Sequence, residues 1–310
     1  MRAIAFAEIG ATPEIHDLAI PEPAAGEIRV RVRAASVNGF DLAVAAGRLE
    51  GMMEHRFPVV LGKDFAGIVD ALGSGVADYA VGDRVFGVVT KEFLGDGSFG
   101  EYVTVPVAIG LAPLPDEVSL TEGAALGLAG TAAVDAVTAA ALTPGQVVLI
   151  AGATGGVGNQ AVQLAARSGA RVIATAHTPA EQDLVTNLGA AEVVDHHRDL
   201  AAEVRAAHPD GVDAVIHLAG DPAALLPALR DGGRLASTIL GAPDQLPTET
   251  ATAIPVYATP TGATLGTLAQ RRAQQQTVVP VERTYPLEQT GQALADFADG
   301  TVGKLIITID

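Results

Sequence analysis

The sequence predicts an α/β protein in which a doubly wound parallel sheet is joined to a β-rich domain. The β-rich part, up to about Pro115, contains short strand candidates separated by glycine-rich turns. Between Gln146 and about Leu240, short apolar runs alternate with helical segments, which is typical of a parallel sheet covered by helices on both faces. Hydrophobic residues make up 49% of the 310 residues, so the chain can bury a large core and is not disordered or fibrous.

The strand candidates of the first part are short and lie next to turn residues. Residues 28–34 alternate apolar and basic side chains, as expected for a strand with one exposed face. Residues 67–69, 84–89 and 101–107 are further candidates. Many short strands of this kind predict a small barrel or sandwich.

The middle part contains five apolar runs that we predict to be parallel strands with helices between them. The runs are residues 147–150, 171–174, 193–195, 212–217 and 234–239, and residues 254–257 are a candidate sixth strand. The tail from about Thr261 has the pattern helix, strand (278–283), helix (287–299), strand (305–309). Because this pattern does not continue the alternation, we expect part of the tail to return to the first domain.

Charge and cysteine content exclude several classes of function. The formal net charge of −17 repels phosphate backbones and anionic membranes, which argues against nucleic-acid binding. The chain has no cysteine, so it has no disulfide, no thiol nucleophile and no cysteine-ligated metal. This composition fits a cytoplasmic protein.

No segment is predicted to target or cross a membrane. The apolar run at the N-terminus ends at Glu8, which is too short for a secretory signal. The uncharged stretch between Asp135 and Arg167 is long enough to span a bilayer. However, Pro144-Gly145 and a cluster of glycines interrupt it, so we predict a buried strand, turn and helix there.

A glycine-rich turn joins the run 147–150 to a predicted helix at residues 157–168. Its Ala-x-Gly-x-x-Gly pattern matches the dinucleotide-binding fingerprint, with Ala in the first glycine position. Such a turn lets the backbone approach a pyrophosphate, and the helix N-terminus offers unpaired N–H groups. We therefore predict cofactor contacts at Ala153, Thr154, Gly155, Gly156, Val157 and Gly158. The alternative is a glycine-rich turn that binds no ligand.

The end of the second apolar run carries no acidic residue. NAD sites usually place an Asp or Glu about 20 residues beyond the glycine turn, whereas residues 174–178 contain none. A carboxylate would repel a 2′-phosphate, so its absence favours NADP(H). The predicted phosphate donors are His177, Thr178, His196, His197 and Arg198, although each histidine can also be a solvated loop residue. The predicted cofactor site also includes Ala219 and Ile239, at or just beyond the ends of the next two runs.

Six motifs spread along the chain occur together. They are Ser36-Val37-Asn38-Gly39-Phe40-Asp41, the run from Phe57 to Val69, Val81-Gly82-Asp83-Arg84-Val85, Gly100-Glu101-Tyr102-Val103, the glycine turn, and Gly303-Lys304-Leu305-Ile306. In these motifs the chain resembles the medium-chain dehydrogenase/reductase superfamily, specifically its zinc-independent quinone oxidoreductase branch. The resemblance implies a GroES-like domain (1–115), a Rossmann NADP-binding domain (116–258) and a segment (259–310) that rejoins the first domain, with the cofactor in the cleft between the domains.

The positions of the zinc ligands in the zinc-dependent relatives carry other residues here. Where those alcohol dehydrogenases have a ligand Cys, a ligand His and a neighbouring Glu, this chain has Asn38, Lys63 and Asp64. Asn and Lys do not form the N/S site that zinc needs, so the resemblance implies no metal. Alcohol oxidation then lacks its Lewis acid. We expect direct hydride transfer from NADPH to a small molecule, either a quinone or the β-carbon of an enone.

The resemblance also implies roles for four residues. Asn38 is expected beside the nicotinamide, where its amide donates to the substrate oxygen or to the ribose, and Thr131 is expected against the nicotinamide. Asp41 is either an N-cap for the short helix that follows it or a polar active-site group. Lys63 either holds a developing oxyanion or relays a proton, or it only pairs with Asp64 or Asp41.

Two departures from the family pattern leave alternatives open. The tyrosines that often follow the Asn-x-x-Asp motif are replaced by Ala43 and Leu49, so solvent or Lys63 must supply the final proton. Glu181 stands where the family has a phosphate-binding Lys. The alternatives to a reductase are an NADPH-binding sensor or scaffold with little turnover and a non-reducing enzyme on the same scaffold. By the same resemblance, we expect a homodimer formed through the edge strand at residues 254–257.

Overall fold

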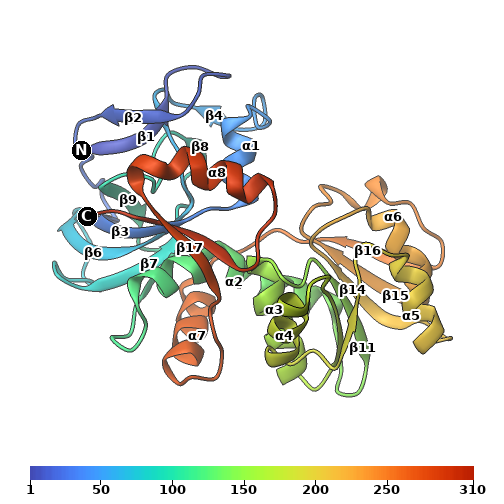
Figure 1. Cartoon of the computed structure of the whole chain (residues 1–310). Helices are drawn as coiled ribbons and strands as arrows, with labels where there is room; N and C mark the ends of the chain where they lie inside the picture. Colours follow the sequence, from blue (N-terminus) through green and yellow to red (C-terminus); the bar gives the residue numbers. More distant parts are fainter. The chain divides into compact units, whose positions relative to one another are not determined.

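The computed structural model describes all 310 residues, which form two compact units. The first unit comprises residues 1–128 and 260–310, and the second comprises residues 129–259. The N-terminal (blue) and C-terminal (red) elements therefore belong to one unit, as Figure 1 shows. The boundary lies inside the long helix α2 (Leu120–Ala140), whereas our sequence-based division begins the middle domain at residue 116.

The first unit consists mainly of antiparallel strands. Its largest sheet has the order β10-β7-β6-β3-β18-β17, and β9 also pairs with β3. The strands of the unit are β1 (Arg2–Phe6), β2 (Glu14–Asp17), β3 (Glu27–Ser36), β4 (Glu54–His55), β5 (Val59–Val60), β6 (Asp64–Leu72), β7 (Arg84–Val88), β8 (Phe93–Leu94), β9 (Tyr102–Pro106), β10 (Leu111–Pro113), β17 (Val281–Pro286) and β18 (Lys304–Thr308). Its helices besides α2 are α1 (Gly39–Ala45), α7 (Gly262–Ala273) and α8 (Thr290–Ala298).

Strand pairing brings distant parts of the sequence to one end of this sheet. Ser36, the last residue of β3, lies opposite Asp64, the first residue of β6. On the other side of β3, Ser36 lies opposite Ile306 of β18, which begins two residues earlier at Lys304. The tail contributes β18, which is an interior strand of the first unit's sheet.

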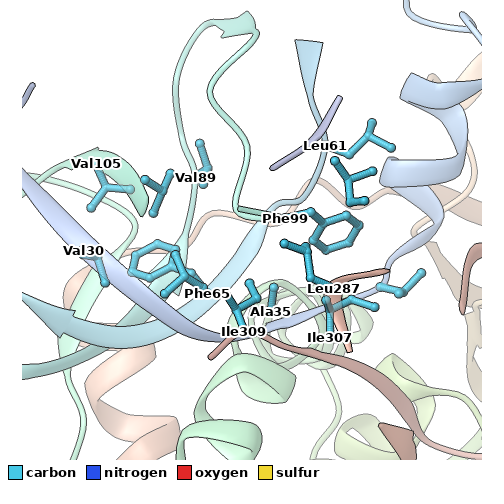
Figure 2. Close-up of a cluster of buried hydrophobic side chains, with 14 of the residues drawn as sticks. Val30, Ala35, Leu61, Phe65, Val89, Phe99, Val105, Leu287, Ile307 and Ile309 are labelled. Carbon is cyan, nitrogen blue, oxygen red and sulfur yellow. The ribbon is translucent and has the colours of Figure 1, made fainter. Parts of the chain in front are cut away.

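The core of the first unit is a cluster of branched and aromatic side chains. Phe65, Phe99 and Ile307 have no exposed surface. Figure 2 shows these side chains together with Val30 from β3 and Leu287 from the segment before α8. Residues from both ends of the first unit's chain thus share one apolar core, and this burial supplies most of its stability.

The second unit contains a parallel sheet of six strands in the order β13-β12-β11-β14-β15-β16. The strands are β11 (Val147–Ala151), β12 (Arg171–Thr175), β13 (Glu192–Val194), β14 (Val212–His217), β15 (Leu229–Ser237) and β16 (Ala251–Pro255). The connecting helices are α3 (Gly156–Arg167), α4 (Pro179–Asn187), α5 (Leu200–Ala207) and α6 (Pro222–Leu225). The order reverses at β11, which is the switch point of a Rossmann sheet.

The predicted α/β fold is confirmed, and each of the five middle runs forms a strand. The sixth strand lies slightly earlier than expected, at Ala251–Pro255. The sequence pattern does not predict α2, because this alanine-rich helix is apolar on all sides and has no stripe of helical period. By length and composition α2 is the one helix that could cross a membrane, but 67% of its apolar window is buried, as in a core helix.

Removing the Phe65 ring should destabilise the first unit. Phe65→Ala leaves a cavity in the core of Figure 2, so we expect a loss of ~3–5 kcal/mol in unfolding free energy, measured by urea denaturation followed by circular dichroism. Val81→Ala, at a side chain that is 65% exposed, is the control and should change stability by less than ~0.5 kcal/mol. Equal effects of the two substitutions would contradict this core assignment.

Candidate functional site

The predicted cofactor-binding residues lie at one edge of the parallel sheet in the second unit. The glycine turn follows β11, and His177 and Thr178 follow β12. His196 and Arg198 follow β13, and Ala219 and Ile239 follow β14 and β15. All of them stand at the carboxyl ends of their strands, around the point where the strand order reverses. Ligands of doubly wound sheets bind at this place.

The glycine turn has the geometry of a phosphate cradle. Helix α3 begins at Gly156 with Gly155 as its N-cap, and no side chain caps its first N–H groups. A Cβ on Gly155 would meet only Gly152 O, at 3.7 Å, so the space above the turn is open. A Cβ on Gly158 would lie 2.1 Å from Gly152 O, so only glycine allows α3 to pack this closely.

Thr175, which the sequence analysis did not single out, holds the turn in place. Its Oγ1 accepts hydrogen bonds from the N–H groups of Gly152 (2.9 Å) and Ala153 (3.3 Å). Asn159 on α3 donates its amide to Thr154 O at 3.1 Å. The only sequence signal for Thr175 is its place as the polar residue that follows an apolar run. These bonds fix the backbone of the turn independently of any ligand.

Three histidines gather around one carboxylate beyond β12 and β13. The ring of His177 lies 4.2 Å from that of His197, which is 4.5 Å from that of His196. His177 Nδ1 is 3.0 Å from Asp195 Oδ1, and Arg198 Nε is 3.7 Å from Asp195 Oδ2. We call these five residues the histidine cluster. Asp195 partly neutralises it, which the sequence analysis did not consider.

A second carboxylate lies close to the end of β12. Glu181 Oε2 accepts the His177 N–H at 2.7 Å, and Thr178 Oγ1 accepts the Glu181 N–H at 3.3 Å, which forms a capping box at the start of α4. Thr178 is therefore the N-cap of α4. The expectation that no acidic group lies at the end of β12 is wrong, because the Glu181 side chain folds back from α4 to this strand end.

A hollow of about 650 Å³ opens beside the histidine cluster. Three predicted cofactor residues line it, namely His196, Arg198 and Ala219. The glycine turn and His177 do not line it, so the hollow extends the candidate site toward α5 and α6. Arg198 is well exposed there and also contacts Glu203 at 3.3 Å.

A buried histidine joins the ends of β14 and β15. His217 Nε2 lies 3.1 Å from Gly220 O, and Nδ1 lies 2.8 Å from Ser237 Oγ. Burial lowers the pKa of His217, so the ring is neutral. With Nε2 as its donor, Nδ1 accepts from Ser237, whose oxygen accepts the N–H groups of Ile239 and Leu240. No sequence pattern predicts this link, which holds the loops carrying Ala219 and Ile239.

In the first unit, Asn38 lies in a buried polar network. Its Nδ2 donates to Asp64 Oδ2 (2.9 Å) and to Ser36 O (3.1 Å). Its Oδ1 accepts from Lys304 Nζ at 2.7 Å. Both amide hydrogens are thus already used, so the expectation that Asn38 donates to substrate or ribose is wrong for this conformation. The side chain instead joins an acidic and a basic residue.

Asp64 and Lys304, neither predicted as a site residue, form the charged core of this network. Asp64 accepts hydrogen bonds from Ser36 Oγ (2.6 Å) and the Leu128 N–H (2.7 Å), and Lys304 Nζ is 3.7 Å from its Oδ2. Burial lowers the pKa of Lys304, and Asp64 and Asp41 oppose this change. A lysine at the start of an otherwise apolar strand was the available signal.

Asp41 is fully buried and is not an N-cap. Helix α1 begins at Gly39 with Asn38 as its N-cap, and Asp41 Oδ2 accepts the Asn38 N–H at 2.8 Å. The N-cap alternative for Asp41 is therefore wrong, because the carboxylate binds the helix start from inside the first turn. Burial raises the pKa of Asp41 to about 7, the Asn38 N–H lowers it, and nearby Asp64 raises it further.

The remaining predicted residues have simpler surroundings. Lys63 Nζ donates to Val89 O at 2.7 Å and lies 4.7 Å from the centre of the Phe40 ring, so it forms no direct pair with Asp64 or Asp41. Burial lowers the pKa of Lys63. Thr131 is fully buried in the part of α2 that belongs to the second unit. No group of three or more His, Cys, Asp or Glu side chains is arranged to hold a metal ion.

Two family models match the chain. Residues 24–116 match the alcohol dehydrogenase GroES-like domain, and residues 156–277 match the zinc-binding dehydrogenase model. Among solved structures, an NAD-dependent alcohol dehydrogenase is 29% identical, with a TM-score of 0.89 and complete coverage of both chains. The chain thus has the two-part architecture of these dehydrogenases.

Two kinds of curated relative match the chain. The quinone oxidoreductase of Lama guanicoe is 29% identical over 336 aligned positions, which cover 100% of this chain and 98% of the relative. The phthioceranic/hydroxyphthioceranic acid synthase of Mycobacterium tuberculosis is 38% identical over 198 residues, or 63% of this chain. The aligned region is only 9% of that synthase, so the match concerns a small part of a much larger protein.

Breaking the buried ion pair should destabilise the first unit. Lys304→Met leaves Asp64 without its counter-charge, so we expect a loss of ~3–5 kcal/mol in unfolding free energy, measured by urea denaturation. Adding Asp64→Asn should recover part of this loss, because the uncompensated charge is then gone. Arg31→Met, which removes an exposed cation on β3, is the control. Equal stability of the Lys304→Met variant and the control would contradict the ion pair.

Proposed function

The chain belongs to the medium-chain dehydrogenase/reductase superfamily as a quinone oxidoreductase-like member, and on this basis we propose that it is an NADPH-dependent reductase. The acceptor is a quinone or an α,β-unsaturated carbonyl compound. The bound nicotinamide supplies the hydride, while the protein supplies binding, orientation and electrostatic stabilisation. The observation that carries the proposal is the open glycine turn at the switch point of the parallel sheet.

The residues of the turn fit a dinucleotide. Open space above Gly155 and the uncapped start of α3 leave room and N–H donors for a pyrophosphate. Thr175 and Asn159 hold the turn, so binding does not require the backbone to reorganise. The hollow beside Ala219 offers space for the rest of the nucleotide.

The preference for NADPH over NADH rests on the histidine cluster. His177, His196, His197 and Arg198 offer donors for a 2′-phosphate at the ends of β12 and β13. Asp195 and Glu181 oppose an anion at the same place. We propose that the four donors together outweigh the two carboxylates, so that the site prefers the 2′-phosphate.

Zinc independence is supported by the partners of Asn38 and Lys63. Asn38 is bonded to Lys304 and Asp64, and Lys63 is bonded to Val89 O. An amide and an ammonium held in this way are poor ligands for zinc. We therefore assign Asn38 to positioning, through its hold on α1 and β18, and not to contact with a metal.

The second unit also carries an exposed sheet edge. β16 is the last strand of its sheet, and Tyr257, just beyond it, is 67% exposed. An open edge of this kind is usually covered. We propose a homodimer that pairs through this edge and functions in the cytoplasm.

A panel of acceptors tests the proposal. Protein and NADPH are mixed with several quinones and enones while the absorbance of NADPH is followed. Oxidation with at least one class supports the reductase. Cofactor binding without oxidation across the panel would favour the sensor or scaffold, which the replacement of both tyrosines by Ala43 and Leu49 keeps as the second candidate.

Gly155→Ala should weaken cofactor binding without unfolding the protein. Its Cβ has space within the protein, but it occupies the place proposed for the pyrophosphate. We expect at least ~10-fold weaker NADPH binding by calorimetry and an unchanged urea midpoint. Gly158→Ala is the contrast, because a Cβ 2.1 Å from Gly152 O should lower stability as well. Unchanged affinity of the Gly155→Ala variant would contradict the proposed place of the pyrophosphate.

The Michaelis constant for NADPH should depend on Arg198. Arg198→Ala removes an exposed cation from the proposed phosphate site, so we expect the constant to rise roughly 3- to 10-fold. NADH lacks this phosphate, so its Michaelis constant should not change. Equal effects on both cofactors would exclude the histidine cluster as the phosphate site.

A further inference from the structure

A small, partly open pocket in the first unit brings together ionisable groups that the proposed function does not yet use. The cavity has a volume of about 20 Å³, which is room for one water molecule. Its polar lining includes Asp41 and Lys63 on one part of the wall and Lys91 and Asp96 on another. The Phe40 ring forms part of the apolar wall of this cavity. Charged groups around a single-water cavity are suited to moving a proton.

The Asp41 carboxyl group is held rigidly at this cavity. One oxygen, Oδ2, accepts the Asn38 N–H, and the residue is only 1% exposed. Lys304 and Lys63 face it as cations, and Asp64 faces it as an anion. Its raised pKa of about 7 means that near neutral pH the group is protonated in part of the molecules. A carboxyl group of this kind can donate a proton at neutral pH.

Lys63 is placed to stabilise the charge that remains after Asp41 loses its proton. Its Nζ is fixed by Val89 O at 2.7 Å and by the face of the Phe40 ring. It lines the same cavity as Asp41, and its positive charge lowers the pKa of that carboxyl group. Asp41 and Lys63 therefore place a proton donor and a positive charge at one pocket with room for a single water molecule.

Lys91 and Asp96, which also line the pocket, belong to a separate polar cluster. Lys91 Nζ bonds to Asp96 Oδ2 (2.6 Å) and Thr104 Oγ1 (2.7 Å), and Glu27 lies 3.4 Å away. The Lys91 side chain is 10% exposed, and the Asp96 side chain is 40% exposed. Asp96 and Lys91 are thus a bonded pair of polar groups at the pocket, and Asp96 is partly exposed to solvent.

We propose that Asp41, acting through the water of this cavity, is the proton source that completes enone reduction. This proposal rests on the proposed function. If bound NADPH supplied a hydride to the β-carbon, the carbonyl compound would become an enolate and NADP⁺ would be the oxidised product. The Asp41 O–H gives its proton to the water, the water gives one of its protons to the α-carbon, and the saturated ketone results. A proton from solvent then returns to the Asp41 carboxylate.

The variant Asp41→Asn tests this role, because an amide oxygen still accepts the Asn38 N–H while the acidic proton is lost. With an enone as acceptor, we expect kcat to fall by about 100-fold or more. With a quinone we expect less than about threefold change, because water protonates the hydroquinone oxygen without help. Wild-type kcat with enones should be constant below about pH 7 and fall above it. The Asp41→Asn variant should lack this fall, which we call the limb of the pH profile.

Two further variants separate proton transfer from a structural role. Lys63→Met removes a cation that lowers the pKa of Asp41. The pKa of Asp41 should therefore rise, and the fall of kcat with enones should begin at a higher pH. Asp70→Asn, which removes a carboxylate paired with Arg29 on the sheet surface, is the matched control and should leave the profile unchanged. An unshifted limb in Lys63→Met overturns the assignment of the limb to Asp41.

A measurement on the cofactor-free protein gives a readout apart from turnover. Infrared titration of wild type should show a protonated carboxyl band that disappears around pH 7 and is absent in Asp41→Asn. Absence of this difference overturns the proposal. Wild-type enone activity in Asp41→Asn overturns it too, while leaving the reductase intact. If wild type reduces quinones but no enone, the proton role of Asp41 alone is overturned. If wild type oxidises NADPH with none of the quinones or enones, both the proton role and the proposed reductase function are overturned.

Discussion

The buried contact between Lys304 and Asp64, bridged by Asn38, is the constraint on which the first unit depends. It joins the ends of three neighbouring strands, β6, β3 and β18, in the middle of one sheet. A charged pair here is costly unless its hydrogen bonds are satisfied. Ser36, Asn38 and the Leu128 N–H satisfy Asp64, and Val37 O and Asn38 satisfy Lys304. The same network fixes the start of α1, and with it Asp41.

In the second unit, backbone groups and neutral side chains hold the loops at the sheet edge in place. Its candidate nucleotide edge is assembled from the ends of separate strands, so each loop needs its own anchor. Thr175 anchors the glycine turn, and the His217–Ser237 pair anchors the loops after β14 and β15. These anchors are buried, whereas the histidine cluster is exposed. The edge therefore combines a fixed frame for the diphosphate with exposed charged and polar groups beside it.

Sequence patterns predicted the strands of the second unit well, because fully buried strands are continuous apolar runs. They also located the glycine turn, whose geometry follows from local residues. They failed where the partner is distant in sequence. Asn38 was assigned to the substrate oxygen or the ribose, because nothing local shows that Lys304, 266 residues away, donates to its oxygen. The sequence around Glu181 likewise does not show that its carboxylate accepts the His177 N–H.

The division of the first unit between residues 1–128 and 260–310 affects how the chain folds during synthesis. The parallel sheet is continuous in sequence, so all of its strands are available once residue 259 has left the ribosome. The first unit must wait for β18, and until then Asp64 has no lysine and the sheet has an open side. The nucleotide-binding part is therefore expected to mature first, and during that delay the unfinished first unit is the part most exposed to chaperones and aggregation.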